Sequence, residues 1–383
     1  MRVAISGWFW NRPETGSGHY LRQLTAALRR EVPELDLTVL LPEPPAEAPH
    51  PDITPALLPP RGASGPDKVI WEQITVPQAA RRLRAEVLHV PYWATPWWTP
   101  VPTVTTIHDV IPLILPDYGH RLSVRLYTAL VRRTAARSAW VLTDSEAARA
   151  DIVRHLPVKA ARVRAIPLAA DAAYTPTPAA DDTARREALG VTAGYLLYLG
   201  GFDARKNLPA LFAALARVRE RQPAARLVVA GKLPAADSDF APDPRRLARE
   251  AGLAEGVVQF AGYVPEASKA ALYRGARAFI FPSRYEGFGL PPLEALACGV
   301  PVVGSRATSL PEVVGDAGVL VAPDDIAGLA AGMLSLLEDA AFHAEMQQRA
   351  ARQAARFSWE RVARQTWAAY KDAAGSRSCQ NKV

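Results

Sequence analysis

Short apolar runs alternate with amphipathic stretches along the first half of the chain. Runs rich in branched and aromatic residues predict strands, and apolar residues spaced three or four apart predict helices. The predicted strands are 2–6, 35–41, 87–90, 103–107, 140–143 and 163–166, and the predicted helices are 19–30, 68–84, 121–137 and 146–155. Strands that alternate with helices in this way are typical of a parallel sheet with helices on both faces.

The alternation restarts after a polar stretch rich in proline and alanine, 171–182, which we interpret as a linker. The later strands are predicted at 195–199, 226–230, 257–260 and 278–281, and the later helices at 207–220, 244–251, 266–275, 326–338, 341–357 and 359–373. We therefore predict an α/β chain of two Rossmann-like, doubly wound domains, 1–170 and 183–357. Residues 375–383 are expected to be disordered.

Composition narrows the class of protein. A chain of 383 residues suits two domains, and 49% hydrophobic residues suffice for two packed cores. No apolar run reaches the length of a membrane-spanning helix, and the N-terminus does not resemble a signal peptide. The two cysteines, Cys298 and Cys379, argue against a disulfide framework and a cysteine zinc site. A cytoplasmic protein is the expectation.

The net charge of +7 has two interpretations. It reflects either a solvated, arginine-rich surface or attraction to an anionic membrane or a phosphorylated acceptor. The same choice applies to the predicted helix 121–137, which combines five arginines with Leu122 and Leu126. No nucleic-acid module or basic tail is present, so no nucleic-acid partner is expected.

The most informative stretch is 283–299, where Glu286 and Glu294 lie eight residues apart. A glycine-containing turn follows Glu286, and prolines suited to a first helical turn follow the turn. Glu294 is expected in the first turn of a short helix that ends at Gly299. Backbone N–H groups of 287–290 would suit a pyrophosphate, and carboxylates beside them would accept hydrogen bonds from hydroxyl groups. This chemistry predicts a nucleotide sugar as ligand.

The spacing of Glu286 and Glu294, with the flanks 278–283 and 299–303, resembles the E-x7-E motif of retaining GT-B glycosyltransferases of family four, the glycosyltransferases of group 1. The resemblance implies two domains that face each other across a cleft. It places the acceptor on the first domain, with helix 358–373 packed back on it, and the nucleotide sugar on the second. It also implies retaining transfer without a cofactor. No Asp-x-Asp metal motif is evident, so no metal ion is expected.

A second motif, Gly200 and Gly201 followed by Arg205 and Lys206, comes after the first strand of the second domain. Arginine offers a bidentate fork to phosphate and lysine a point charge, although surface cations after a turn would look the same. The resemblance implies that these cations hold the donor diphosphate. Gly201 stands where the commoner pattern has arginine, and Arg-Lys-Asn resembles a variant of O-antigen mannosyltransferases. GDP-mannose is therefore the favoured donor and a UDP-hexose the second.

A third motif, Gly16, Ser17 and Gly18, follows the first strand. Leu21 stands where a dinucleotide fingerprint would need glycine. The alternatives are an ordinary turn and, by the resemblance, a flexible loop beside the donor phosphates. The resemblance also assigns donor contacts to the turn after Glu286 and to two further strand ends: Gly231, Lys232, Tyr263, Val264, Gly287, Phe288, Gly289 and Leu290.

Candidate acceptor and catalytic groups follow strands of the first domain. His108 is either structural or, by the resemblance, close to the reacting sugar carbon. Asp109 is expected to orient it or to place the acceptor. Tyr92 and Trp93 belong to an unusually aromatic loop that either packs at a domain edge or walls the acceptor pocket.

The predicted function is hexosyl transfer, with mannose favoured, to an acceptor hydroxyl of a glycan, glycolipid or small molecule. The resemblance implies that Arg205 and Lys206 stabilise the leaving diphosphate. It also implies that Glu286 binds the sugar hydroxyls and that Glu294 binds the ribose hydroxyls. A UDP-hexose-dependent glucosyl or N-acetylglucosaminyl transferase is the first alternative. A glycoside hydrolase with two catalytic carboxylates and a non-catalytic nucleotide-sugar-binding protein are the others. The sequence does not predict an oligomeric state.

Overall fold

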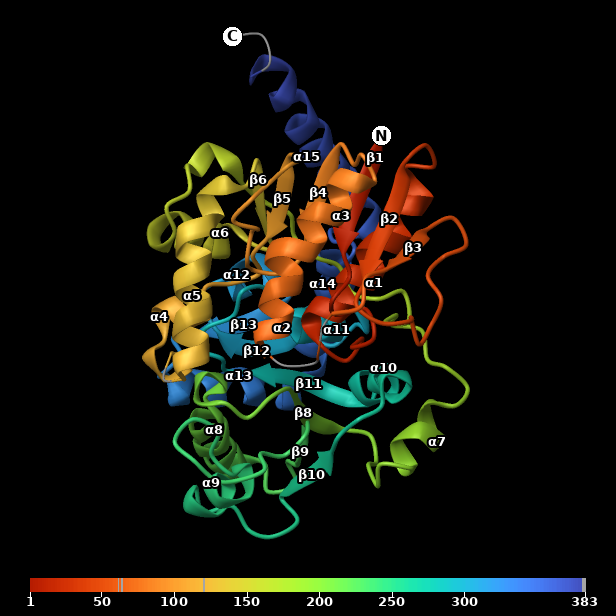
Figure 1. Cartoon of the computed structure of the whole chain (residues 1–383). Helices are drawn as coiled ribbons and strands as arrows, with labels where there is room; N and C mark the ends of the chain where they lie inside the picture. The colour runs from red at the N-terminus through yellow and green to blue at the C-terminus, as the bar shows by residue number, and fades with distance from the viewer. Residues whose placement is uncertain (61, 63–64, 120, 381–383) are drawn as a thin grey trace. The chain divides into compact units, whose positions relative to one another are not determined.

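The computed structural model describes residues 1–60, 62, 65–119 and 121–380 and divides into two units. The first unit is Met1–Leu168 with Ser358–Val383, and the second is Ala169–Phe357. Each unit has a parallel sheet and a hydrophobic core of its own (Figure 1). The fold class of two doubly wound α/β domains is therefore confirmed, and each unit is described separately below.

The sheet of the first unit has the strand order β3-β2-β1-β4-β5-β6-β7, and all of its pairings are parallel. The strands are β1 Arg2–Ser6, β2 Asp36–Leu41, β3 Thr54–Leu57, β4 Val87–Val90, β5 Thr103–Thr106, β6 Trp140–Thr143 and β7 Val163–Ala165. Sequence reasoning missed β3, which lies between proline-rich loops and contains Pro55. Proline is tolerated there because β3 is an edge strand.

Helices connect the strands of this sheet. They are α1 Gly16–Glu31, α2 Gly65–Ile70, η1 Trp71–Thr75, α3 Val76–Arg82, α4 Ile111–Ile114, η2 Pro116–Tyr118, α5 Leu122–Thr134, η3 Ala135–Arg137, α6 Glu146–His155 and η4 Ala160–Arg162. The predicted helix 68–84 is a continuous run of α2, η1 and α3, and its middle turn is a π-helix. Pro77 has no N–H to donate to the preceding turn, which explains the wider turn before it.

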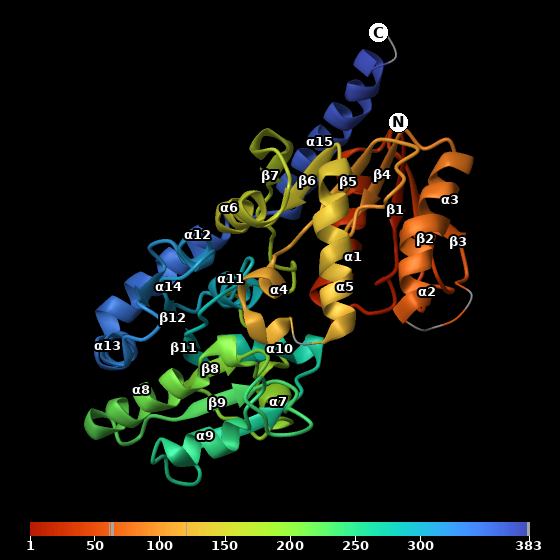
Figure 2. The ribbon, with the colours of Figure 1, turned by 60° about the vertical axis from the view of Figure 1, so that its left-hand side comes forward.

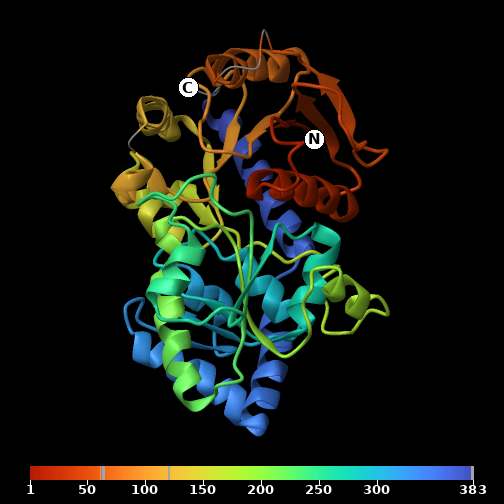
Figure 3. The ribbon, with the colours of Figure 1, turned by 90° about the horizontal axis from the view of Figure 1, so that it is seen from below.

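The last helix, α15 Trp359–Gln380, packs against α1 in the first unit (Figure 3). Tyr370 Oη lies 2.7 Å from Nδ1 of the buried His89, and Arg364 forms an ion pair with Glu31. The predicted helix end at 373 and the disorder from 375 are wrong, because alanines at 373 and 374 favour helix and α15 continues to Gln380. The rest of the predicted tail, 381–383, lies outside the described residues.

The second sheet repeats the same winding, with the order β10-β9-β8-β11-β12-β13 (Figure 1). Its parallel strands are β8 Tyr195–Leu199, β9 Leu227–Ala230, β10 Val258–Gly262, β11 Ala276–Phe281, β12 Val302–Ser305 and β13 Gly318–Val321. Sequence reasoning missed β12 and β13. Both are short and contain glycine, which weakens the pattern of a strand.

Helices again flank this sheet, and α8 packs against both α9 and α13 (Figure 2). The helices are α7 Asp182–Glu187, η5 Ala204–Lys206, α8 Leu208–Arg221, α9 Pro244–Glu250, α10 Glu266–Arg274, α11 Leu290–Ala297, α12 Leu310–Val314, α13 Ile326–Glu338 and α14 Ala340–Ala354. The stretch predicted as a linker has no helix or strand before α7. Asp182, the last residue of that stretch, is buried in an ion pair with Arg274.

The strand order places one switch point in each sheet. Successive strands are added on opposite sides of β1 and of β8, so the loops after β1 and β4 diverge, and so do those after β8 and β11. Ligands of such sheets bind outside the carboxyl ends of the strands at this point. Nearly all of the predicted site residues follow these strands or their neighbours.

Candidate active site

The loops after β8 and β11 bring the two predicted phosphate cations onto Glu286. Lys206 Nζ lies 2.6 Å from Glu286 Oε1, and Arg205 Nη1 lies 2.7 Å from Glu286 Oε2. Arg205 also donates to the carbonyl of Tyr285 at 2.9 Å and pairs with Asp203 at 3.0 Å. The adjacent strands β8 and β11 thus place both cations on one carboxylate.

Burial and charge act in opposite directions on Glu286. Burial of the carboxyl would raise its pKa, but the charges of Lys206 and Arg205 more than compensate and hold the pKa below its ordinary value of 4.5. Glu286 is therefore ionised at neutral pH. Glu286 and Asp203 together balance the charges of Lys206 and Arg205, and an anion that displaced Glu286 would meet two cations already placed side by side.

Hydrogen bonds hold the loop that carries Glu286 in place. Asn207, in the left-handed region at φ 58°, donates its amide to the carbonyls of Pro282 and Pro323. Thr308 Oγ1 accepts from the N–H of Glu286 at 3.0 Å, and Ser309 Oγ donates to the Glu286 carbonyl at 3.0 Å. Sequence reasoning missed Thr308 and Ser309, which lie between β12 and α12. Asn207, directly after η5, entered it only as part of the Arg-Lys-Asn pattern.

Glu294 lies in the second turn of α11, and the expectation of the first turn is wrong because the helix begins at Leu290. Its carboxylate accepts from Tyr273 Oη at 2.8 Å. Burial raises the pKa of Glu294 to about 7. The two glutamates therefore differ in electrostatics, because the cations that bind Glu286 do not contact Glu294.

Backbone geometry explains two of the glycines, Gly231 by close approach and Gly289 by its positive φ. A Cβ on Gly231, which has φ 147°, would lie 2.1 Å from the carbonyl oxygen of Gly200. Gly289 has φ 116° and forms the N-cap of α11. The ends of β8 and β9 and the start of α11 thus present backbone rather than side chains, which suits a ligand that contacts backbone.

The remaining predicted donor residues of this unit differ in exposure. Tyr263 and Lys232 are exposed, so their side chains are accessible to a ligand. Val264 is buried in the core, and Phe288 is buried against Phe357, with ring centroids 6.0 Å apart. Val264 and Phe288 therefore offer a ligand their backbone atoms at most.

In the first unit, Gly16, Ser17 and Gly18 form the first turn of α1 rather than a flexible loop. Thr15 is the N-cap, and its hydroxyl accepts from the N–H of Gly18. This cap explains why the helix begins three residues before the predicted start. The N-terminus of a long helix is a favourable place for an anion.

His108 and Asp144 form a pair at the ends of β5 and β6. Nδ1 of His108 lies 2.7 Å from Asp144 Oδ2, and the ring meets that of Tyr20 edge to face. Asp109 instead accepts from the N–H of Ile111 at 3.0 Å. Sequence reasoning missed Asp144. This residue directly follows β6, and His108 likewise comes shortly after β5.

This pair predicts a measurable titration. Burial lowers the pKa of His108, but the charge of Asp144 reverses that effect and the net pKa lies above 6.5. We expect Asp144→Asn to lower the pKa of His108 in an NMR titration of the ring, and to lower it more than Asp109→Asn does. An unchanged pKa in Asp144→Asn would contradict the pairing.

The predicted acceptor residues Tyr92 and Trp93 follow β4 and line an apolar hollow of ≈ 770 Å³. Sequence reasoning missed the charged pair beside them. Lys68 Nζ lies 2.8 Å from Glu72 and 5.1 Å from the ring of Tyr92. Burial raises the pKa of Glu72 although Lys68 opposes the rise.

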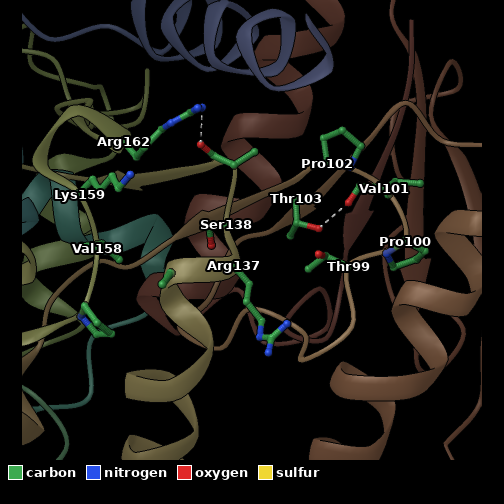
Figure 4. A pocket seen from close by; sticks show the side chains of 13 residues that line it. Thr99, Pro100, Val101, Pro102, Thr103, Arg137, Ser138, Val158, Lys159 and Arg162 are labelled. Carbon is green, nitrogen blue, oxygen red and sulfur yellow. Dashed lines mark hydrogen bonds between the residues drawn. The ribbon is translucent and has the colours of Figure 1, made fainter. Parts of the chain in front are cut away.

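A separate hollow of ≈ 470 Å³ lies at the opposite edge of the first sheet, where β5, β6 and β7 begin (Figure 4). Its lining includes Arg137, Lys159 and Arg162, and Arg162 donates to the carbonyl of Ala139 at 3.3 Å. No predicted site residue lines it. Because ligands of such sheets bind at the carboxyl ends of strands, we do not assign the reaction to this hollow.

In the described part of the chain, no three His, Cys, Asp or Glu side chains lie together so as to hold a metal ion. Asp237 and Asp239 do have the Asp-x-Asp spacing, but Asp237 is ion-paired with Arg246. Within the same residues no single helix has the length and apolar character to span a bilayer, and only one sharply bent helix pair does.

Comparison with known families covers most of both units. Residues 15–174 match the model described as Glycosyltransferase Family 4, and residues 193–339 match the model described as Glycosyl transferases group 1. The first match spans α1 to the end of the first sheet and includes His108 and Asp144. The second includes Arg205, Lys206 and both glutamates.

Curated relatives and a solved structure point the same way. The chain is 37% identical over 273 residues to the O-antigen chain mannosyltransferase B of Escherichia coli, which covers 70% of each protein. It is 30% identical to the serotype-specific mannosyltransferase WbdA of E. coli over 72% of this chain and 33% of that longer protein. Sucrose-phosphate synthase of Thermosynechococcus elongatus shares the fold, with a TM-score of 0.76, 24% identity and coverage of 98% and 100%.

Proposed function

We propose that this chain, which belongs to the group 1 glycosyltransferases of family 4, moves a mannosyl unit from a nucleoside-diphosphate sugar to an acceptor hydroxyl with retention of configuration. Glycosyl transfer follows from membership of the family. The sugar, the nucleotide and the stereochemistry are our proposal. The observation that carries it is the convergence of Arg205 and Lys206 on Glu286 after adjacent strands.

The leaving diphosphate is the group that these cations would stabilise. In the bound state its oxygens would replace Glu286 as partners of Arg205 and Lys206, and the freed carboxylate would accept hydrogen bonds from sugar hydroxyls. The bond from the sugar carbon to the diphosphate breaks, and the acceptor oxygen bonds to the same face of that carbon. The diphosphate takes the acceptor proton, so no side chain needs to act as base.

The other residues have supporting roles in this proposal. Glu294 would accept hydrogen bonds from the ribose hydroxyls, and the exposed Tyr263 and Lys232 would lie near the base. The N-terminus of α1 would contribute N–H groups to the diphosphate. His108, oriented by Asp144, would hold a sugar hydroxyl. No metal ion or cofactor enters the proposed reaction.

The donor assignment rests on mannosyltransferase relatives and on Arg205-Lys206-Asn207. A UDP-hexose is the second candidate. The test is a thermal-shift panel with GDP, GDP-mannose, UDP and UDP-glucose, because a ligand that binds only the folded state raises its stability. We expect GDP-mannose to raise the melting temperature most and EDTA to leave the shift unchanged.

Assays of turnover distinguish the proposed transferase from a hydrolase and from a non-catalytic binding protein. Anomeric analysis of the product by NMR is expected to give the configuration of the donor, and inversion would contradict the mechanism. Hydrolysis of an aryl glycoside without nucleotide would instead favour the hydrolase. Binding of GDP-mannose without any turnover, across a panel of glycan and glycolipid acceptors, would favour a non-catalytic binding protein.

The acceptor is proposed to be a glycan or glycolipid bound by the first unit. Helix α5 exposes Leu122 and Leu126 beside Arg121 and Arg125. Such a surface suits peripheral contact with an anionic membrane. Co-sedimentation with phosphatidylglycerol vesicles, and its loss at high salt, would test this contact.

A further inference from the structure

An apolar hollow of the first unit lies between α2 and α5, the two helices labelled in Figure 2. Its volume is ≈ 770 Å³, within the range of pockets that enclose small organic molecules. The side chains of Val69, Ile70, Val124, Leu126 and Leu130 line it, together with the rings of Tyr92, Trp93 and Tyr127. Most of these residues have no assigned role in the transfer reaction proposed above.

The polar groups at this hollow bind one another. Lys68 Nζ lies over the rings of Phe9, Tyr92 and Tyr127, between 4.9 and 5.5 Å from their centroids. It pairs with the buried Glu72, which also accepts from Tyr127 Oη at 3.1 Å. The charges of Lys68 and Glu72 and the hydroxyl of Tyr127 are thus compensated by one another, which holds the ring of Tyr127 in position. The wall is therefore preformed and presents hydrocarbon to an occupant.

The rim of the hollow is both apolar and basic. Leu126, which lines it, is 63% exposed, and Ile70 is 43% exposed. Arg121 and Arg125 are exposed on the same helix, and within the described residues neither forms an ion pair with a carboxylate. Exposed apolar side chains next to unpaired cations complement a molecule with a hydrocarbon chain and an anionic group.

We propose that the hollow between α2 and α5 binds the hydrocarbon chain of a phosphate-bearing lipid, and that this lipid carries the acceptor hydroxyl. The chain lies against Leu126, Leu130 and Trp93, and the phosphate lies near Arg121 and Arg125. Only the identification of this lipid as the acceptor rests on the proposed function. Binding of the lipid chain stands on the geometry of the first unit alone.

The test measures binding of alkyl phosphates of four, seven and ten carbons to the whole protein, below their micelle concentrations. Affinity is expected to rise about three- to fourfold for each methylene that enters the hollow. Inorganic phosphate should bind more weakly than any of them, and decanol should bind more weakly than decyl phosphate. Affinity that does not depend on chain length would overturn the proposal.

Two leucines on α5 supply matched variants. Leu126 lines the hollow and is 63% exposed, whereas Leu122 is 68% exposed and does not line it. Leu126→Asn should lower the affinity for decyl phosphate at least tenfold, and Leu122→Asn, which adds no charge beside Arg121 and Arg125, should leave it unchanged. Equal losses of vesicle binding in both variants, with unchanged affinity for decyl phosphate, would show a general membrane surface and overturn the proposal.

Two further measurements separate the remaining outcomes. A dimer that dissociates in Leu126→Asn would show that a second copy of the chain covers the hollow, which also overturns the proposal. Binding of GDP-mannose by the same variants reports on the second unit. If nucleotide sugars fail to bind while chain-length dependence remains, the proposed function fails and the lipid site stands.

Discussion

Replacing Lys206 with alanine is expected to lower turnover at least about a hundredfold, as does loss of one preorganised donor at a developing anion. The variant should fold, because Glu286 keeps its ion pair with Arg205 at 2.7 Å. The loss is expected mainly in kcat, since charge on the diphosphate develops most in the transition state. Steady-state kinetics with GDP-mannose measures both constants.

The counterpart variant, Glu286→Ala, should lower turnover by a similar factor and also affect folding. It leaves Lys206 without its carboxylate, whereas Arg205 keeps its ion pair with Asp203. Loss of one partner of a buried pair typically costs about 3–5 kcal/mol. Glu286→Gln keeps the shape and separates the two effects. Arg284→Ala is the control, because this half-exposed cation of the same loop pairs with Asp324. Near-normal turnover in Lys206→Ala would refute the assigned role.

Glu294→Gln is expected to stabilise the protein without ligand at pH 8 by up to about 3 kcal/mol. The folded state holds a proton on Glu294 up to a pKa of about 7, whereas the unfolded chain releases it near 4.5. Stability from this residue is therefore fully present at low pH and falls as pH rises from about 4.5 to 7. Glutamine carries no charge and removes this loss.

Denaturant unfolding at pH 4 and pH 8 tests this prediction. The variant and the parent should differ at pH 8 and agree at pH 4, and Glu255→Gln, at an exposed position of the same unit, should change neither value. The same variant should bind the donor about tenfold more weakly, because a hydrogen bond to a charged acceptor contributes more than one to an amide. Equal stability at pH 8 would mean that Glu294 is well solvated when ionised.

The fold and the positions of the site residues could be predicted to different depths. Each switch-point loop was found from residues that follow a strand, because parallel strands end at one edge and expose their successors there. The ion pairs of Glu286 could not be predicted, since 80 residues separate it from Lys206 and no local pattern records that contact. Asp144 could have been predicted, because it directly follows a strand. Lys68 and Glu72 could not, because their aromatic surroundings come from three separate segments.

The hydrogen bond between Tyr370 and His89 affects the order in which the two units can fold. One unit is closed by a helix from the far end of the chain, whereas the other is a single uninterrupted segment. On the ribosome the inner segment can therefore complete its sheet first. The outer one is completed only after α15 has emerged, and until then His89 and the face of α1 are uncovered.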